Sequence, residues 1–314
     1  MPVHHPRLIR ELGARERVLE IGPGAFPFPR ADVLCDRYAR DDPHAIHQDG
    51  NVARPRYGKP VLIYEGKLPF ADGAFDYVVC SHVLEHVPVG EEDAFVSELA
   101  RVAREGYLEV PSYLLEVTND VSVHRWLVHV AADGEIRMLP KERVADLVAG
   151  ASAALRPIFE SLTGVSPGYQ QLYRDYVDLW VVGIPWRGRP RLRRVETLEQ
   201  LLEGGGVERS IAPLADRERA ERPLARQIGR ALARRARALL PRARGAEGPT
   251  LDGASDVAFP EWVGAITVCP SCGTAGLDFQ AAAAHCRRCR ARFPSAAGEF
   301  HLVADRAAAA PARA

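Results

Sequence analysis

A short apolar run that breaks into a glycine turn, Val18 to Gly24, constrains the fold of this chain most. Val18 to Ile21 has the length and β-branched content of a buried parallel strand. The glycines that follow let the backbone bend tightly and approach a ligand. A dinucleotide fold needs a third glycine three residues after the second, and Phe26-Pro27 occupy that region. The turn therefore predicts a cofactor loop without a pyrophosphate cradle, which disfavours an adenosine-linked oxidoreductase.

A second apolar run, Asp32 to Cys35, ends in an acid, Asp36. In a doubly wound sheet, an acid at the tip of the second strand can accept hydrogen bonds from both hydroxyls of a ribose. Glu20, within the first run, can orient the glycine turn or meet an amino group of the ligand. These residues predict a nucleoside ligand without a diphosphate. The alternative is an ordinary strand-to-helix turn beside a solvated acid.

These residues resemble class I S-adenosylmethionine-dependent methyltransferases, and the resemblance extends through the block from Leu68 to His86, which contains LPFADGAFD and SHVLEH. The likeness runs from about Val18 to Ser112, about a third of the chain. It implies a doubly wound, mainly parallel, seven-stranded α/β sheet that binds S-adenosyl-L-methionine. It further implies cofactor contacts by Glu20, Gly22, Gly24, Asp36 and, for the adenine amine, Glu65. In the family that acid stands where Tyr64 lies here.

Three histidines are candidates for catalysis. His82 and His86 follow the fourth expected strand, at the carboxyl edge where such sheets bind ligands. A histidine there can act as a general base on the acceptor, or the segment can simply cap a helix and shape the pocket wall, as it usually does in the family. His124, with Arg125 and His129, lies beyond the fifth strand and is a candidate for acceptor contact. Methyl transfer depends mainly on alignment, so the lack of a catalytic triad does not argue against an enzyme.

Near the end of the chain, four cysteines form C-x2-C-x13-C-x2-C: Cys269, Cys272, Cys286 and Cys289. Two such pairs bring four thiolates to the corners of a tetrahedron, which predicts structural zinc. A redox or disulfide role is the alternative. The segment resembles the small zinc-ribbon activator subunits that pair with methyltransferases, although Arg290 replaces their usual glycine. Cys35 and Cys80 lie in expected strands and are predicted to be buried apolar residues.

Length and composition set the organisation of the chain. Its 314 residues carry 41 basic and 41 acidic side chains, so no global charge points to nucleic acid or membrane. No apolar run approaches the ~20 residues that span a bilayer, and we expect a cytoplasmic protein. We predict a methyltransferase domain over 1–205, a basic helix and linker over 206–260, a zinc ribbon over 261–305 and a disordered tail over 306–314.

The arginines of segment 222–244 have two interpretations. They dock an acidic partner, RNA or an anionic surface, or they form the solvated face of a packed helix. Elsewhere, hydrophobic spacing predicts strands at 61–64, 75–80, 106–111 and 176–182, a hairpin over 126–138, and helices at 8–13, from 91, at 139–155 and at 197–203.

These features predict an S-adenosylmethionine-dependent methyltransferase that moves a methyl group to an unidentified acceptor by in-line displacement. The alternative is a catalytically inactive methyltransferase-fold module that recruits a partner through its zinc ribbon and basic helix.

Overall fold

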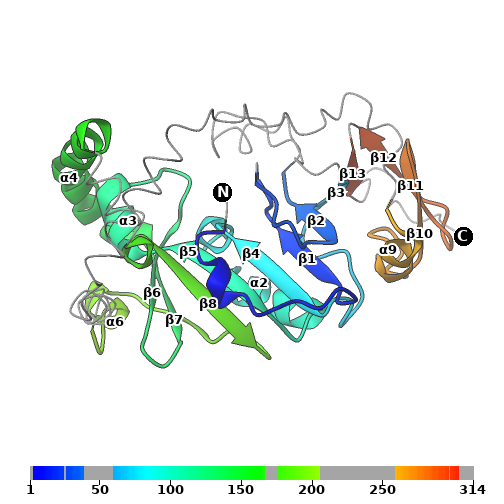
Figure 1. Cartoon of the computed structure of the whole chain (residues 1–314), viewed down its shortest axis with the longest axis horizontal. Helices are drawn as coiled ribbons and strands as arrows, with labels where there is room; N and C mark the ends of the chain where they lie inside the picture. The colour runs from blue at the N-terminus through cyan, green and yellow to red at the C-terminus, as the bar shows by residue number, and fades with distance from the viewer. Residues whose placement is uncertain are drawn as a thin grey trace, which may run out of the picture.

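The computed structural model describes residues 3–24, 26–38, 59–166, 176–205, 259–296 and 298–303. The predicted basic helix at 222–244 and the predicted tail at 306–314 lie outside these residues. Five parallel strands form the centre of the molecule in the order β3-β2-β1-β4-β5 (Figure 1). They are β1 (Val18–Ile21), β2 (Val33–Asp36), β3 (Val61–Tyr64), β4 (Tyr77–Ser81) and β5 (Glu105–Pro111).

Both faces of this parallel sheet are covered, which explains why its strands are apolar runs rather than alternating ones. Helix α2 (Glu92–Val102) packs Val96 and Leu99 on the face that also carries Val78. The opposite face, with Val79 and Tyr107, is covered by the N-terminal segment through residues such as Ile9. The sequence pattern thus predicted the central strands correctly, and an extended segment covers much of the second face.

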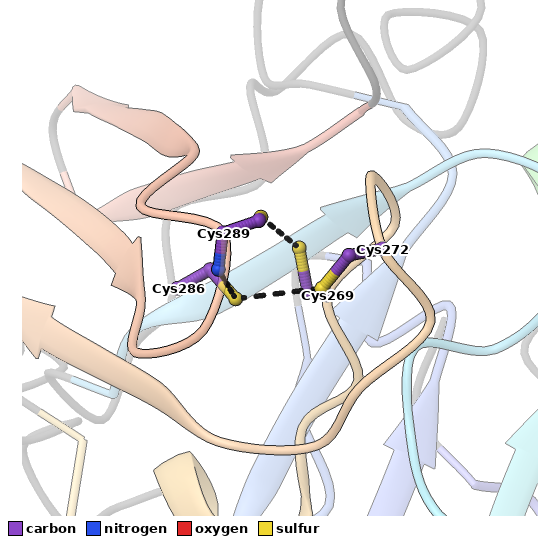
Figure 2. A group of neighbouring side chains, drawn as sticks. All are labelled: Cys269, Cys272, Cys286 and Cys289. Carbon is purple, nitrogen blue, oxygen red and sulfur yellow. Dashed lines mark hydrogen bonds between the residues drawn. The ribbon is translucent and has the colours of Figure 1, made fainter.

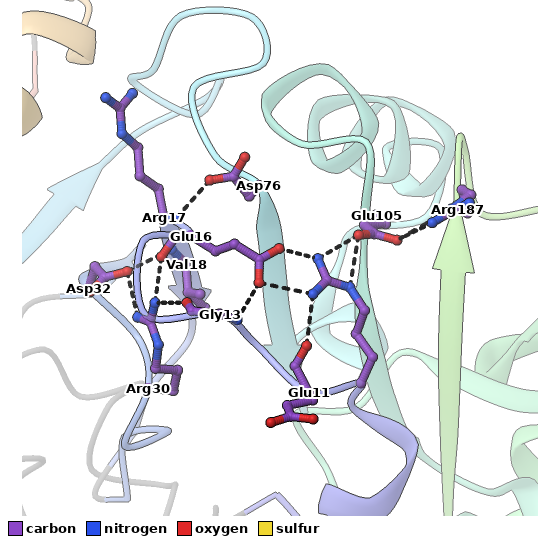
Figure 3. Close-up of polar contacts among 11 residues, drawn as sticks. Glu11, Gly13, Glu16, Arg17, Val18, Arg30, Asp32, Asp76, Glu105 and Arg187 are labelled. Atoms are coloured by element: carbon purple, nitrogen blue, oxygen red, sulfur yellow. Dashed lines mark hydrogen bonds and ion pairs between the residues drawn. The ribbon is translucent and has the colours of Figure 1, made fainter.

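The N-terminal segment is held by ion pairs in place of a helix. The expected helix over 8–13 is wrong, because only a 3-10 turn, η1 (Pro6–Leu8), forms there. The Arg10 guanidinium lies 2.6 Å from both Glu16 and Glu105, which also pairs with Arg187 (Figure 3). The segment is also fixed by hydrogen bonds from the His4 and His5 amides to Glu109 and by packing of Ile9 and Leu12 on the sheet.

Strand β8 (Val181–Arg187) runs antiparallel to β5 and forms one edge of the sheet. A second, small sheet has the order β6-β7-β9 and comprises β6 (Trp126–Val130), β7 (Ile136–Pro140) and β9 (Leu192–Arg194). The hairpin expected over 126–138 is confirmed. The same region contains η2 (Leu84–His86), α3 (Tyr113–Asn119), η3 (Lys141–Val144), α4 (Ala145–Val165), η4 (Val177–Leu179) and α6 (Leu198–Leu201).

Two elements begin and end later than the sequence predicts, because α4 extends to Val165 and β8 extends to Arg187. The helix expected at 139–155 begins at Ala145, because Leu139 and Pro140 complete β7 and pair with β6. The strand expected at 176–182 begins at Val181, after the 3-10 turn η4. In both places strand pairing, which is not local in sequence, decides where each element begins.

The cysteine-rich segment joins the central sheet. After α9 (Glu261–Ile266) come β10 (Leu277–Gln280), β11 (Ala283–Cys286), β12 (Arg292–Ala296) and β13 (Glu299–Leu302). Strand β13 pairs in parallel with β3, so the described residues form one ten-stranded sheet where seven strands were expected (Figure 1). The physical reason is that β3 ends the parallel array with unpaired backbone groups, which β13 satisfies.

A second contact ties α9 to the loop before β4. Phe70 and Thr267 form a β-bridge, and the Ala71 amide donates to the Ile266 carbonyl over 2.9 Å. Trp262 packs edge-to-face on Phe75. The predicted LPF block is therefore part of the surface that holds the ribbon. Among the described residues, none of the helices is both long and apolar enough to cross a membrane.

Candidate cofactor and acceptor site

The glycine turn and Asp36 lie side by side at the carboxyl edge of the sheet. Ile21 of β1 is paired with Cys35 of β2, so Gly22 and Asp36 are the next residues of two adjacent parallel strands. Gly22 and Gly24 have positive φ angles of 68° and 53°, which glycine adopts without steric cost. The structure therefore brings together the predicted turn and the predicted ribose acid.

Gly22 also has a packing role. A Cβ built on Gly22 would lie 2.3 Å from Cγ2 of Val83, in the segment after β4. Any side chain at this position therefore forces the turn away from β4. The glycine is required by the fold itself, and its replacement does not by itself report on a ligand.

Glu20 lies beneath the turn, 3% exposed, and its carboxylate accepts a hydrogen bond from the Phe28 amide over 2.8 Å. It thereby holds the backbone at Phe28 against the sheet. Burial raises the pKa of Glu20 to about 7, and the Phe28 hydrogen bond only partly opposes this. This geometry fits the orienting role expected for Glu20.

The Asp36 carboxylate accepts a hydrogen bond from the Tyr38 amide over 3.1 Å. Burial raises the pKa of Asp36 to about 6, while hydrogen bonds from the backbone of Tyr38 and Arg37 lower it. Glu65 follows β3 at the same edge, two strands from β1, and its side chain is exposed. Tyr64, which occupies the expected adenine position by spacing, is buried in the core.

A cavity of about 450 Å³ lies beside this edge. Its lining includes Tyr38, two residues beyond Asp36, together with His86, His124, Arg125 and Lys141. The cavity therefore links the end of β2 to the segments that follow β4 and β5. His86 and His124 face it as predicted candidates, whereas His129 lies on β6 and is not part of its lining.

His82 is buried, 7% exposed, between two carboxylates. Its Nδ1 lies 3.3 Å from Glu85 Oε1 and its Nε2 lies 3.5 Å from Glu109 Oε1. Burial lowers the pKa of His82, but the contacts with Glu109 and Glu85 outweigh it and raise the pKa to about 9. His82 is therefore charged near neutral pH, which opposes the general-base role considered for it. Its φ of 56° is the strained left-handed conformation, which these ion pairs help to hold.

Sequence reasoning missed the carboxylates of this region. Glu109 on β5 accepts hydrogen bonds from the His4 and His5 amides, from the Ser81 hydroxyl and from the Tyr107 hydroxyl. These donors and His82 outweigh the effect of burial and lower the pKa of Glu109 to about 2. An acid inside the apolar run 106–111 was the available signal, since buried strands rarely carry an unpaired charge.

His124 and Glu116 form a second buried pair. The Nδ1 atom of His124 hydrogen-bonds to the carboxylate of Glu116, which is fully buried on α3. The ammonium of Lys141 lies 3.5 Å from the other oxygen of Glu116 and 2.7 Å from Asp120. The His86 and His124 rings meet edge-to-face, with centroids 4.7 Å apart. These contacts fix His124 against the cavity wall.

The four cysteines of the ribbon converge, as Figure 2 shows. The Cys269 and Cys289 sulfurs lie 3.7 Å apart, and so do those of Cys272 and Cys286. Four sulfurs at about 2.3 Å from a central ion, at tetrahedral corners, lie about 3.8 Å from one another. A disulfide instead requires about 2.05 Å. The donor set and its spacing thus fit zinc. Cys35 and Cys80 are buried in β2 and β4, as expected.

Comparison with known proteins addresses the chemistry of the N-terminal part. Residues 51–108 match the family described as methyltransferase domain. This segment includes β3, β4, α2 and the first half of β5. The match supports methyl transfer in general terms and leaves the acceptor unspecified.

The curated relatives agree with this family. Uncharacterized methyltransferases of Mycobacterium leprae (strain Br4923) and Mycobacterium avium (strain 104) are 35% identical over 101 residues and 36% identical over 107 residues. These matches cover 31% and 33% of this chain. The chain spans only 37% and 41% of the length of these relatives.

Among solved structures, an S-adenosylmethionine-dependent methyltransferase from Mesorhizobium loti is similar over 59% of this chain and 98% of that chain. The identity is 12% and the TM-score 0.30. Similarity at this level is too low to transfer a function, so the functional argument depends on the site and on the family match.

Proposed function

We propose that this chain is an S-adenosylmethionine-dependent methyltransferase that transfers the methyl group by in-line displacement to an acceptor bound in the cavity beside His86 and His124. One observation carries the proposal: the glycine turn and the Asp36 carboxylate end two adjacent parallel strands at the carboxyl edge of the sheet, and Tyr38, two residues beyond Asp36, lines the cavity. Doubly wound sheets bind nucleotide ligands at this edge.

The residues present fit the cofactor. The Gly22 and Gly24 backbone, with positive φ, presents a side-chain-free surface to the methionine portion. Glu20 holds the turn in place through the Phe28 amide. The Asp36 carboxylate, ionised above its raised pKa of about 6, accepts hydrogen bonds from the ribose hydroxyls. Glu65, exposed at the end of β3, is the proposed partner of the adenine amine.

When bound, S-adenosylmethionine supplies a methyl group on a positively charged sulfur, which is a good leaving group. The chain then has to exclude water and align the acceptor, and alignment of this kind supplies ~7–11 kcal/mol. The cavity wall carries both charges: Arg125 and Lys141 lie there with Glu142, and Lys141 is paired with Glu116 and Asp120, so the wall does not by itself select the charge of the acceptor.

For the ribbon, we propose a structural zinc ion held by Cys269, Cys272, Cys286 and Cys289. All four positions of the tetrahedron are filled by protein, so no position is open for a substrate. The ribbon is too small for its own hydrophobic core to stabilise it, and the bound ion supplies the missing stability. Through β13, the ribbon then supports the edge of the methyltransferase sheet.

Calorimetric titration of the full chain with S-adenosylmethionine tests the cofactor site. We expect wild type to bind and Asp36→Asn to bind at least about tenfold more weakly, since hydrogen bonds to a charged group contribute ~1.5–3 kcal/mol. Asp93→Asn is the matched control, because Asp93 lies on α2 and pairs with Arg189. No heat with wild type, or equal affinity of the Asp36 and Asp93 variants, would contradict the proposal.

A further inference from the structure

Three metal-ligating side chains meet at the wall of the cavity, apart from the cysteines. Glu85 and His86 are consecutive residues of η2, and His124 lies just before β6. Their ligand atoms all lie within 4.8 Å of one another. The Arg125 amide donates to the Glu85 carbonyl over 2.8 Å, and the Trp126 indole donates to the Val87 carbonyl. These contacts hold the two segments in register.

Both histidines have the outer partners that metal-bound imidazoles usually have. His124 uses Nδ1 for the Glu116 carboxylate, which leaves its Nε2 for an ion. His86 hydrogen-bonds to the backbone of Val123. A ring nitrogen bound to a carboxylate or a carbonyl fixes the tautomer and the ring orientation of the histidine, and raises its basicity as a ligand. The arrangement is thus pre-oriented for coordination.

Glu85 supplies an independent observation. The residue is fully buried, and neither oxygen of its carboxylate has a hydrogen-bond partner. Its one close cationic contact among the described residues is His82 Nδ1, 3.3 Å from Oε1. The charged His82 compensates this carboxylate in part, and a cation bound to Oε2, which has no hydrogen-bond partner, completes the compensation.

The neighbouring cluster of His4, His82 and Glu109 also brings ligand atoms within 4.8 Å. Glu109, however, already accepts from the His4 and His5 amides and from the hydroxyls of Ser81 and Tyr107. Its oxygens are satisfied without an ion. The cluster of Glu85, His86 and His124 is therefore the better candidate for a metal site, because the oxygens of Glu85 have no hydrogen-bond partner.

We propose that Glu85, His86 and His124 bind a divalent transition-metal cation at the wall of the cavity. Two imidazoles and one carboxylate suit Mn²⁺, Fe²⁺ or Zn²⁺, and they leave coordination positions open. His86 and His124 line the cavity, so these positions face the space where an oxygen ligand of the acceptor can enter. The site differs in kind from the ribbon, whose four thiolates leave none open. Metal binding here does not depend on the proposed methyl transfer.

Mn²⁺ is the probe, because thiolates select softer ions and the cysteine site therefore contributes little. Electron paramagnetic resonance counts the free and bound Mn²⁺ in solutions of the full chain. We expect one bound ion per chain for wild type, and at least tenfold weaker binding for Glu85→Gln and for His124→Gln. The control is His129→Gln, on β6 five residues after His124 and outside the cluster, which should bind like wild type.

A fourth variant separates coordination from folding. Glu116→Gln keeps the shape of α3 but weakens the partner of His124, and such outer contacts change metal affinity ~10–100-fold. Circular dichroism verifies that each variant is folded. The proposal is overturned if wild type binds no more Mn²⁺ than folded Glu85→Gln, or if His129→Gln loses binding to the same extent. Because the readout is metal binding alone, it stands or fails separately from the S-adenosylmethionine titration.

Discussion

At the scale of single residues, Glu20 couples the glycine turn to pH. Burial raises its pKa from 4.5 to about 7 in the folded chain. A group whose pKa is higher in the folded than in the unfolded state stabilises the fold at pH values below its unfolded-state pKa. This stabilisation is lost as the pH rises through the folded-state pKa. Glu20 therefore becomes destabilising between about pH 5 and pH 8.

Glu20→Gln keeps the acceptor for the Phe28 amide and removes the titration. We expect the free energy of unfolding of this variant to exceed that of wild type increasingly from about pH 5 to about pH 8, by up to ~3 kcal/mol at 1.36 kcal/mol per pKa unit. Urea denaturation of the cofactor-free chain measures it. Glu91→Gln, at an exposed acid before α2, is the control. If the difference in free energy of unfolding between Glu20→Gln and wild type does not change with pH, the pKa of Glu20 is not raised in the folded chain.

Arg290 is a second residue at which a single substitution should change stability, because its backbone has a left-handed conformation. It follows Cys289 with φ 62°, and Gly273 follows Cys272 with φ 69°. The two amides donate to the carbonyls of Cys286 and Cys269, so the positions are equivalent turns of the two metal knuckles. The left-handed conformation costs an L-residue about 1–2 kcal/mol.

Arg290→Gly should raise the free energy of unfolding of the zinc-loaded ribbon by about 0.5–1 kcal/mol, after the entropic cost of glycine is subtracted. The reciprocal change, Gly273→Ala, should lower it by about 1 kcal/mol through backbone strain alone, since nothing lies within 4 Å of the added Cβ. Denaturation in the presence of zinc measures both. Changes of the same sign in the two variants would contradict the turn equivalence.

At the scale of elements, strand β13 transmits the state of the ribbon to the methyltransferase sheet. Phe300 is paired with Leu62 and His301 with Ile63, so the backbone of β3 is protected on this side by the ribbon. The core cluster is also continuous, because Phe293 and Phe300 pack with Leu62 and Leu68. A ribbon that unfolds without zinc therefore exposes β3.

Removal of zinc with a chelator should increase amide hydrogen exchange in β10–β13 and also at Val61–Tyr64, because β3 loses its partner strand. Exchange in β4, at the centre of the sheet, is the internal control. Cys289→Ser should reproduce the effect without chelator, and Glu85→Gln should not. Unchanged exchange at Val61–Tyr64 after zinc removal would mean that β13 holds its place without the ion.

At the scale of the whole molecule, local sequence patterns predicted some features of the fold, whereas others depend on contacts between distant segments. The apolar runs at 18–21, 32–35, 61–64 and 75–80 identified the first four parallel strands, which the structure places within two residues of these bounds, because strands buried on both faces need continuous apolar sequence. The two C-x2-C pairs identified the four cysteines that converge, although the close sulfur contacts, Cys269 to Cys289 and Cys272 to Cys286, join the two pairs and are made by folding. The helix predicted at 8–13 is wrong, because the N-terminal segment packs on the sheet and contacts Glu105 and Glu109, which lie far along the chain.

The contacts of the buried acids also could not be predicted from the sequence. Glu85 lies in a motif that reads as a helix cap, and Glu109 and Glu116 stand among apolar residues, so no spacing in the chain links them to His82 or His124. Only folding places β4, β5 and α3 side by side and removes water from the charges between them. The amino-acid pattern was sufficient to predict the parallel strands, the glycine turn and the two cysteine pairs, because each is a local feature of the sequence. The ten-stranded sheet and the Glu85-His86-His124 cluster required the tertiary structure, because strand-edge pairing and shared desolvation act between segments distant in the chain.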